Sequence, residues 1–214
     1  IRTALDGTTN GSKILMYGEP WTGGTSQCPN PCNQAHVTSL DSRIGMFNDT
    51  YRDAIKGSTD GSDGNFLQGS ETDTGKIATG VNGKSFAAKA PSQTIAYADA
   101  HDNLILWDKL VKSNGSTNYT GTDAKIQNQL IGGMALLTTS QGIPFMTAGT
   151  EMGRTKKGDT NSYKSSDDIN QIDWNRANTM KNLPAWYKML VALRTNVTAI
   201  NSNSFVSPSF ASQM

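Results

Sequence analysis

The sequence alternates short apolar segments with helical patterns, and this alternation limits the possible folds more than any other feature. Each apolar segment is too short for a helix and carries residues typical of buried strands. They are residues 13–17 (KILMY), 43–47 (RIGMF), 94–98 (TIAYA) and 143–148 (IPFMTA). Strands that alternate with helices predict parallel βαβ units with right-handed crossovers, rather than a β-sandwich.

The helical patterns have recognisable starts and stops. Asn48 is the expected N-cap of a first helix, and Gly57 its expected end. Further helices are expected around residues 104–112 and over residues 123–139, where apolar residues recur every three or four positions. Pro184 is expected to open a last helix. The apolar stripe of that helix is Trp186, Met189, Leu190 and Leu193.

Two polar stretches are expected to form surface loops, over residues 57–83 and from the end of the fourth strand through Asp173. Their Gly, Ser, Asp and Thr content is too high for core elements. The second loop contains Asp159, Asp167 and Asp168. An Asp-rich stretch of this kind usually lies in a solvated loop. Calcium binding there is a minority alternative, because the oxygen ligands lack EF-hand spacing. We expect no cofactor to be required.

The number of strand and helix units limits the architecture further. A closed (β/α)8 barrel needs about 250 residues and eight such units, and the 214 residues here supply four. The count predicts half of a barrel. The rival is a small open doubly wound sheet, but that class usually has a Gly-rich phosphate turn after its first strand. No such turn is present.

Charge and composition exclude several classes of protein. There are 19 Lys and Arg against 18 Asp and Glu, so we expect neither a basic patch nor a nucleic-acid partner. The longest uncharged stretch, residues 126–150, is interrupted by polar residues and does not resemble a membrane-spanning helix. A zinc site needs four ligands, and Cys28 and Cys32 have no second pair of Cys or His at the usual spacing. A local disulfide is favoured over free thiols.

Two acidic residues follow predicted strands and suggest glycosidic chemistry. Glu19 follows the first strand and Asp102 the third, so both carboxylates are expected at the ligand-binding end of the sheet. A paired acid and carboxylate can protonate a glycosidic oxygen and stabilise an oxocarbenium-like transition state. Trp21 offers a flat face for a sugar ring. Each residue also has a structural reading: a helix cap or ion pair for the acids, a buried hydrogen-bonded residue for His101, and a core residue for Trp21.

Four longer segments carry a more specific pattern. They are residues 14–21 (ILMYGEPW), 43–57 (RIGMFNDTYRDAIKG), 96–110 (AYADAHDNLILWDKL) and 142–174 (GIPFMTAGTEMGRTKKGDTNSYKSSDDINQIDW). In this order they resemble type I pullulanases, the debranching enzymes of the α-amylase superfamily, glycoside hydrolase family 13. The resemblance implies an α/β fold: strands five to eight, with their helices, of a (β/α)8 TIM barrel. Residues 1–200 would form this C-terminal half, and residues 201–214 a tail leading toward a β-sandwich.

The resemblance also implies a reaction and roles for individual residues. The activity implied is retaining hydrolysis of α-1,6-glucosidic linkages in pullulan, amylopectin and related α-glucans. Glu19 would be the general acid/base and Asp102 the transition-state stabiliser. The implied substrate contacts are His101 at the cleavage subsite, Trp21 and Asn103 on the leaving-glucan side, and Asp159 on the other side.

One departure from the family pattern is central. The family nucleophile is an Asp in a GFRFD-like motif, which this sequence lacks. The nucleophile and the first four strands are therefore expected upstream of Ile1, in the same gene product or a separate chain, and this chain alone is expected to be inactive. The alternative is a non-catalytic α-glucan-binding half-barrel. An extracellular location is expected from the polar composition and the close Cys pair.

Overall fold

The computed structural model describes residues 1–24 and 31–206, and a four-stranded parallel sheet lies at its centre. The strands follow one another in both sequence and space, in the order β1-β2-β3-β4. Their bounds are Met16–Gly18 (β1), Ile44–Phe47 (β2), Thr94–Ala96 (β3) and Ile143–Pro144 (β4). Because every neighbouring pair is parallel, the expectation of successive βα units is confirmed. The fold is part of a (β/α)8 barrel.

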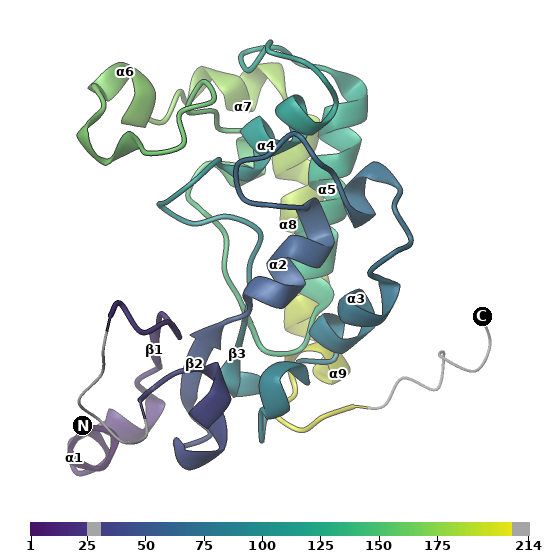
Figure 1. The fold of residues 1–214 in the computed structure, drawn as a ribbon. Helices are drawn as coiled ribbons and strands as arrows, with labels where there is room; N and C mark the ends of the chain where they lie inside the picture. Colours follow the sequence, from purple (N-terminus) through teal and green to yellow (C-terminus); the bar gives the residue numbers. More distant parts are fainter. Residues whose placement is uncertain (25–30, 207–214) are drawn as a thin grey trace.

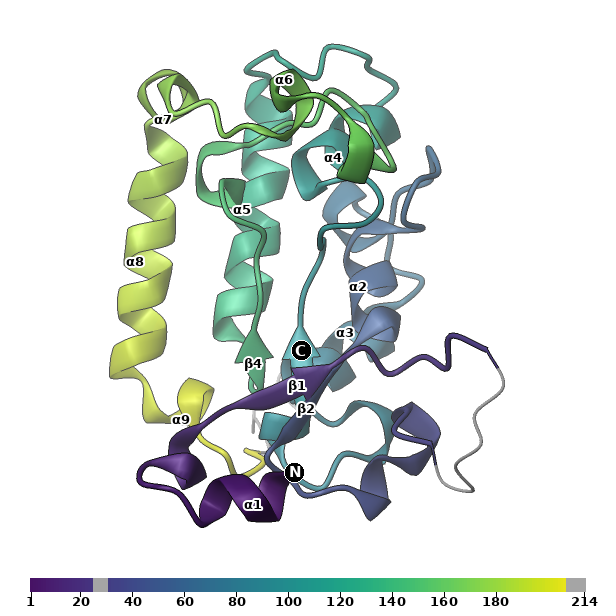
Figure 2. The ribbon, with the colours of Figure 1, turned by 90° about the vertical axis from the view of Figure 1, so that its left-hand side faces the viewer.

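Helices cover one face of this sheet (Figures 1 and 2). Figure 2 shows α2, α5 and α8 standing side by side behind the strands, with α4, α6 and α7 grouped at one end. Within the described residues, no helix covers the opposite face. The helix bounds are Arg2–Asp6 (α1), Asp49–Lys56 (α2), Thr74–Val81 (α3), Leu106–Ser113 (α4), Ala124–Thr139 (α5), Asp167–Asn170 (α6), Asn175–Thr179 (α7), Asn182–Asn196 (α8) and Thr198–Asn201 (α9).

Alternation along β3 separates two buried clusters. Ala96 and Ala98 face the helices and belong to the main core, together with Trp107 of α4 and Leu130 of α5. Ile95 and Tyr97 belong to a second cluster on the open face. Successive strand residues point to opposite sides of a sheet, so the large side chains of β3 lie on the face that a closed barrel would enclose.

The expected helix signals are present at α2 and α5. The Asn48 side chain accepts a hydrogen bond from the amide of Tyr51 at 3.1 Å, and Asp123 accepts one from Ile126 at 3.1 Å. Each thereby satisfies an amide in the first helical turn that has no partner within the helix. Gly57 ends α2 with φ +85°, a left-handed conformation that favours glycine.

The first strand is not buried on both faces, contrary to the expectation from its apolar sequence. Ile14, Leu15 and Tyr17 are 45%, 49% and 54% exposed. The physical reason is position: β1 is an edge strand with one neighbour, β2, and no described element packs over its outer side chains.

The stretches expected to be loops contain helices. In residues 57–83, α3 forms because Ile77 is buried and Gly80 lies directly against the Tyr51 ring of α2. A Cβ at Gly80 would meet that ring at 2.2 Å, so the glycine permits close helix packing. The second stretch contains the short helix α6.

The prediction of a buried apolar stripe on α8 is wrong for three of the four residues. Leu190 is buried, but Trp186, Met189 and Leu193 are each more than 40% exposed. The buried face instead uses Leu183 and is held to α5 by Arg194, which donates to the carbonyl of Thr138 at 3.0 Å. The rest of the apolar surface of α8 faces away from the described core.

Two expectations fall wholly or partly outside the described residues. The proposed disulfide needs Cys28, which is not described, and Cys32 is exposed. Of the tail over 201–214, residues up to Val206 are described, and the Val206 amide donates to the Gln141 side chain at 2.9 Å.

Candidate active site

A cleft of about 370 Å³ opens at the carboxyl ends of the strands. Segments that follow β1, β2, β3 and β4 all contribute to its walls. Five of the six predicted site residues line it: Glu19, Trp21, His101, Asp102 and Asn103. This is the edge at which parallel α/β proteins place their ligand sites.

The first wall comes from the turn after β1. Glu19 is exposed and follows the last strand residue, Gly18, directly, while Pro20 beside it is buried. Trp21 is 46% exposed, and its indole N–H lies 3.4 Å from a carboxylate oxygen of Asp49. The structural reading of Trp21 as a core residue is therefore wrong, since its ring borders the cleft.

The second wall comes from the loop after β3. His101 and Asp102 are 73% and 67% exposed, and His101 Nε2 lies 3.3 Å from Asp102 Oδ2. The reading of His101 as a buried histidine is also wrong. Both side chains are available to a ligand.

Asn103 is fixed from two sides and adopts a left-handed backbone conformation. Its φ is +66°, which costs energy for a residue other than glycine but is best tolerated by Asn and Asp. The Asp60 carboxylate accepts hydrogen bonds from Asn103 Nδ2 at 2.7 Å and from the Leu104 amide at 2.9 Å. The Asn103 amide donates to the Thr160 carbonyl at 3.0 Å. Asp60 therefore sets the shape of the turn that carries Asp102.

The loop that carries Asp60 is itself anchored on α4. Lys109, which is fully buried, donates to the carbonyls of Gly61 and Asp63 at 2.8 and 2.7 Å. Lys112 donates to the Asp60 carbonyl at 2.7 Å. Two lysines one helical turn apart thus hold this loop against the helix. The sequence did not reveal this anchoring, because the loop is recognisable there only as a polar stretch.

Asp159 is not brought into the cleft. Its carboxylate accepts hydrogen bonds from Ser165 Oγ at 2.5 Å and from the Asn161 amide at 2.8 Å, and these bonds hold its pKa below the ordinary value. Asp159 thus bonds within its own loop, and that loop adjoins the cleft: the Lys156 ammonium donates to the His101 carbonyl at 3.2 Å.

A buried anchor below the cleft joins the loops after β3 and β4. Asp99 accepts hydrogen bonds from the Leu106 amide at 2.7 Å and from Thr147 Oγ1 at 2.9 Å. Burial raises the pKa of its carboxyl, and these hydrogen bonds oppose that effect. Because both oxygens are engaged, Asp99 is better suited to holding the site together than to attacking a substrate.

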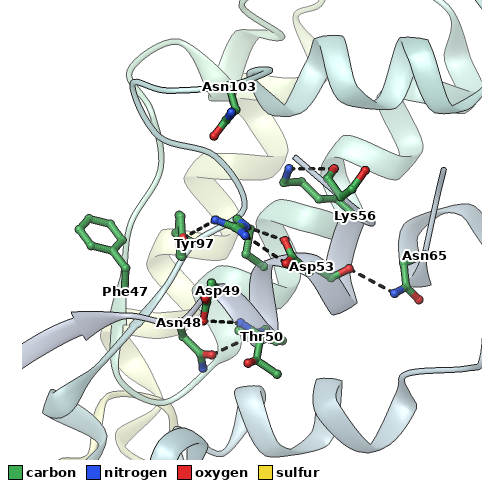
Figure 3. A network of polar contacts seen from close by, with 12 residues as sticks. Phe47, Asn48, Asp49, Thr50, Asp53, Lys56, Asn65, Tyr97 and Asn103 are labelled. Carbon is green, nitrogen blue, oxygen red and sulfur yellow. Dashed lines mark hydrogen bonds and ion pairs between the residues drawn. The ribbon is translucent and has the colours of Figure 1, made fainter. Parts of the chain in front are cut away.

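Sequence reasoning also missed the aromatic and cationic residues that line the cleft. Phe47 makes edge-to-face contacts with Tyr97 and Phe145, at ring-centroid distances of 4.9 and 5.1 Å. Arg52 pairs with Asp53 at 2.7 Å and donates to the Tyr97 hydroxyl at 2.9 Å (Figure 3). Burial raises the pKa of Tyr97 to about 12. These residues belong to strands and to α2, where a sequence pattern signals only packing.

The described ranges, 1–24 and 31–206, contain no cluster of three or more His, Cys, Asp or Glu side chains suited to a metal ion. Asp168, in the loop expected to be solvated, is exposed and pairs with Lys157 at 2.5 Å. Over the same ranges, no helix combines the length and apolarity needed to cross a membrane.

Comparison with known proteins assigns this arrangement to a family. The pullulanase of Bacillus subtilis (strain 168) is 36% identical over 191 residues, which are 85% of this chain and 26% of that protein. No protein-family model matches the chain.

Solved pullulanases share the fold as well as the sequence. The structure of a pullulanase from Bacillus acidopullulyticus has a TM-score of 0.84 and 35% identity, covering 95% of this chain and 25% of the other. A pullulanase from Paenibacillus barengoltzii, in complex with maltohexaose and α-cyclodextrin, has a TM-score of 0.86 and 33% identity, covering 95% and 32%. This chain spans a quarter to a third of the length of these relatives. By sequence and by fold, the chain belongs to the pullulanase-like family.

Proposed function

We propose that this chain carries the acid/base side of an active site that hydrolyses α-1,6-glucosidic linkages in pullulan, amylopectin and related α-glucans. The observation that carries the proposal is the shared cleft: Glu19 and Asp102 come from different strands and line the same cavity. Two carboxyl groups around one cavity suit glycosidic cleavage. The maltohexaose and α-cyclodextrin in complex with the Paenibacillus barengoltzii pullulanase support an α-glucan ligand.

The proposed reaction uses each residue at a defined point. Glu19 gives its proton to the bridging oxygen as the bond to the anomeric carbon breaks, so the leaving glucan departs as an alcohol. Asp102 and His101 bind hydroxyl groups of the sugar and stabilise the oxocarbenium-like transition state. In the second step Glu19, now ionised, takes a proton from the water that releases the sugar.

Three further contacts complete the proposed substrate site. The Trp21 ring stacks on a sugar ring on the leaving-glucan side, and Asn103 borders the same side. The resemblance assigns Asp159 to the opposite side, and its loop adjoins the cleft through the hydrogen bond of Lys156 to the His101 carbonyl.

A retaining mechanism needs a nucleophilic carboxylate about 5 to 5.5 Å from the acid, and we propose that it comes from the upstream half of the barrel. The exposed apolar residues Ile14 and Leu15, which precede edge strand β1, and Tyr17 within it support a covering segment there. So do Trp186 and Met189 on the outer side of α8, since exposed strand edges and exposed apolar surfaces favour pairing with another element. The upstream half is then either part of the same protein or a separate chain.

The test is reducing-sugar release from pullulan, with Glu19→Gln as the variant. The protein with its upstream half should release sugar, and the variant should not, while both bind maltotriose. This chain by itself should be inactive. Full activity in the variant would contradict the assigned role of Glu19.

A non-catalytic α-glucan-binding half-barrel is the second candidate. One observation favours it: among the described residues that line the cleft, the only acid besides Glu19 and Asp102 is Asp99, whose oxygens are both engaged. Calorimetric binding of maltotriose without sugar release, even after the upstream half is added, would select this candidate.

We further propose that the activity requires no cofactor and that the protein acts outside the cell. Incubation with EDTA should leave sugar release unchanged, and restoration of lost activity by Ca²⁺ would contradict this. Fractionation of the source cells tests the location.

A further inference from the structure

Lys56, the last residue of α2, is a buried cation in the wall of the cleft. Its exposed fraction is 1%, yet it lines the cavity together with Thr59, Asp99 and Asn103. Figure 3 shows its side chain running from α2 toward the side on which Asn103 and Tyr97 lie. A buried ammonium is costly unless acceptors replace its water, so the partners of Lys56 are informative.

The hydrogen bonding of Lys56 is poor compared with that of the other buried lysines. Its ammonium has a single protein acceptor among the described residues, the Ser58 carbonyl, at 3.5 Å. Lys109 has two carbonyl acceptors at 2.8 and 2.7 Å. Lys156 donates to Ser162 Oγ at 2.7 Å. An ammonium has three donors, and those of Lys56 are largely unused.

The charges around Lys56 do not explain its burial. Arg52 on α2 and Lys109 on α4 repel it, while Asp53 and Asp99 attract it. Neither acid lies within ion-pair distance of it among the described residues. Both Asp99 oxygens are already used, and Asp53 is paired with Arg52. Burial therefore dominates, and it lowers the pKa of Lys56 to about 8.

We propose that Lys56 is a substrate-binding residue whose ammonium donates hydrogen bonds to hydroxyl oxygens of a glucosyl unit held in the cleft. This inference rests on the proposed function and adds a residue from α2 to it. A neutral polyol suits the site better than an anion, because the cleft also contains Glu19 and Asp102. The unused donors of Lys56 then gain acceptors when the sugar enters.

The proposal gives ligand binding and folding opposite dependences on pH. The folded pKa of Lys56 lies below the unfolded value of 10.5. The unfolded chain therefore binds more protons between about pH 8 and 10.5, and this group makes stability rise with pH there. Sugar affinity should instead fall as pH rises through 8, because the neutral amine loses charge and donors. Since bound sugar favours the charged form, binding above the folded pKa should be accompanied by proton uptake.

The experiment is titration calorimetry of the purified protein with maltotriose, at pH 6.5 to 9.5 and in buffers of different ionisation enthalpy. Lys56→Met keeps a similar shape without charge, and Lys56→Arg keeps the charge. Lys125→Met, on an exposed position of α5, is the matched control. We expect Lys56→Met to lose about 10- to 100-fold in affinity, the range for hydrogen bonds to a charged group. It should also lose the proton uptake, whereas Lys125→Met should keep both.

The outcomes separate this inference from the function on which it rests. Unfolding temperatures check that the variants are folded; removal of a weakly paired buried charge should not lower them. Maltotriose binding that is equal in the wild type and Lys56→Met, without proton uptake, would overturn the role of Lys56 and leave the proposed function intact. If the wild type binds chloride or phosphate in competition with sugar, the polyol assignment is wrong. No binding of any α-glucan would overturn the proposed function itself.

Discussion

The two walls of the cleft differ in how they are supported. The wall that carries Asp102 and His101 is anchored from below by Asp99 and from the side by Asp60, whose loop is held by two lysines of α4. The wall that carries Glu19 follows edge strand β1, whose side chains are about half exposed. One wall is thus stabilised by hydrogen bonds within the chain, and the other follows an exposed edge strand. The difference suggests that the placement of Glu19 depends on the rest of the barrel more than that of Asp102 does.

The largest effect is expected from removing charge on the self-supported wall. In the protein with its upstream half, Asp102→Asn should lower kcat for pullulan hydrolysis by about 10²- to 10³-fold, the range for losing one group that stabilises transition-state charge. Maltotriose affinity should change far less, because the transition state gains more from this carboxylate than the ground state does. Steady-state kinetics and calorimetry provide the measurements. An equal loss in affinity and rate would show uniform binding instead.

Core truncations compare the stability of the two regions directly. Leu110→Ala in α4 removes a fully buried side chain and should reduce the free energy of unfolding by about 2 to 5 kcal/mol. Leu15→Ala beside β1 should cost about 0.5 kcal/mol or less in this chain alone, since Leu15 is half exposed. Urea unfolding measures both. When the upstream half is added, Leu15→Ala should reduce the free energy of unfolding by more than it does in this chain alone. If the reduction is unchanged, the covering segment lies elsewhere.

Asp60→Ala tests the clamp on the Asp102 wall. The substitution removes the acceptors of Asn103 Nδ2 and the Leu104 amide, so the left-handed turn should loosen. We expect faster hydrogen exchange at Leu104 and a loss in kcat/KM of about 10-fold, equivalent to about 1.4 kcal/mol. Asp60→Asn should recover part of the activity, because its carbonyl oxygen still accepts one bond. Unchanged exchange at Leu104 would contradict the clamp.

The smallest effect concerns acid sensitivity near β1. Arg43 bonds to Asp41 and Asp6, and these bonds lower the pKa of both carboxyls. The lowered pKa values give stability above the unfolded value of 3.8 that is lost as pH falls through the folded values. Solvent screening keeps this contribution small. Asp41→Asn should flatten the dependence of the unfolding temperature on pH below 4; an unchanged slope would mean that the exposed pair contributes nothing.

The sequence predicted the parts of the fold that depend on local chemistry. The cap at Asn48, the four strands and the acids that follow them are visible as short-range patterns, whereas Asp123 was recognised only as the start of its helix. The exposure of β1 and of the α8 stripe was not visible in the sequence. A pattern of apolar residues is the same whether the side chains face the chain's own core or lie exposed on its surface. The same limit applies to α3, where burial of Ile77 and close packing at Gly80 outweigh a polar composition.

The candidate site was predictable to a similar extent. Glu19 and Trp21 closely follow β1, and Asp102 lies in the loop that follows β3, so their position in the chain reveals their position in space. Lys56 and Asp60 sit on a helix end and a loop, and their relation to the cleft arises only when α2 packs beside β3. Asp159 was inferred from resemblance alone, and its role stays a prediction.

The most direct test of the central claim is a crystal structure of the protein, carrying Glu19→Gln, with maltotriose bound. We expect sugar density in the cleft, with a ring against Trp21, hydroxyl groups at Asp102 and His101, and an oxygen within hydrogen-bond distance of Lys56 Nζ. Sugar bound at another surface, with the cleft occupied only by water, would contradict it.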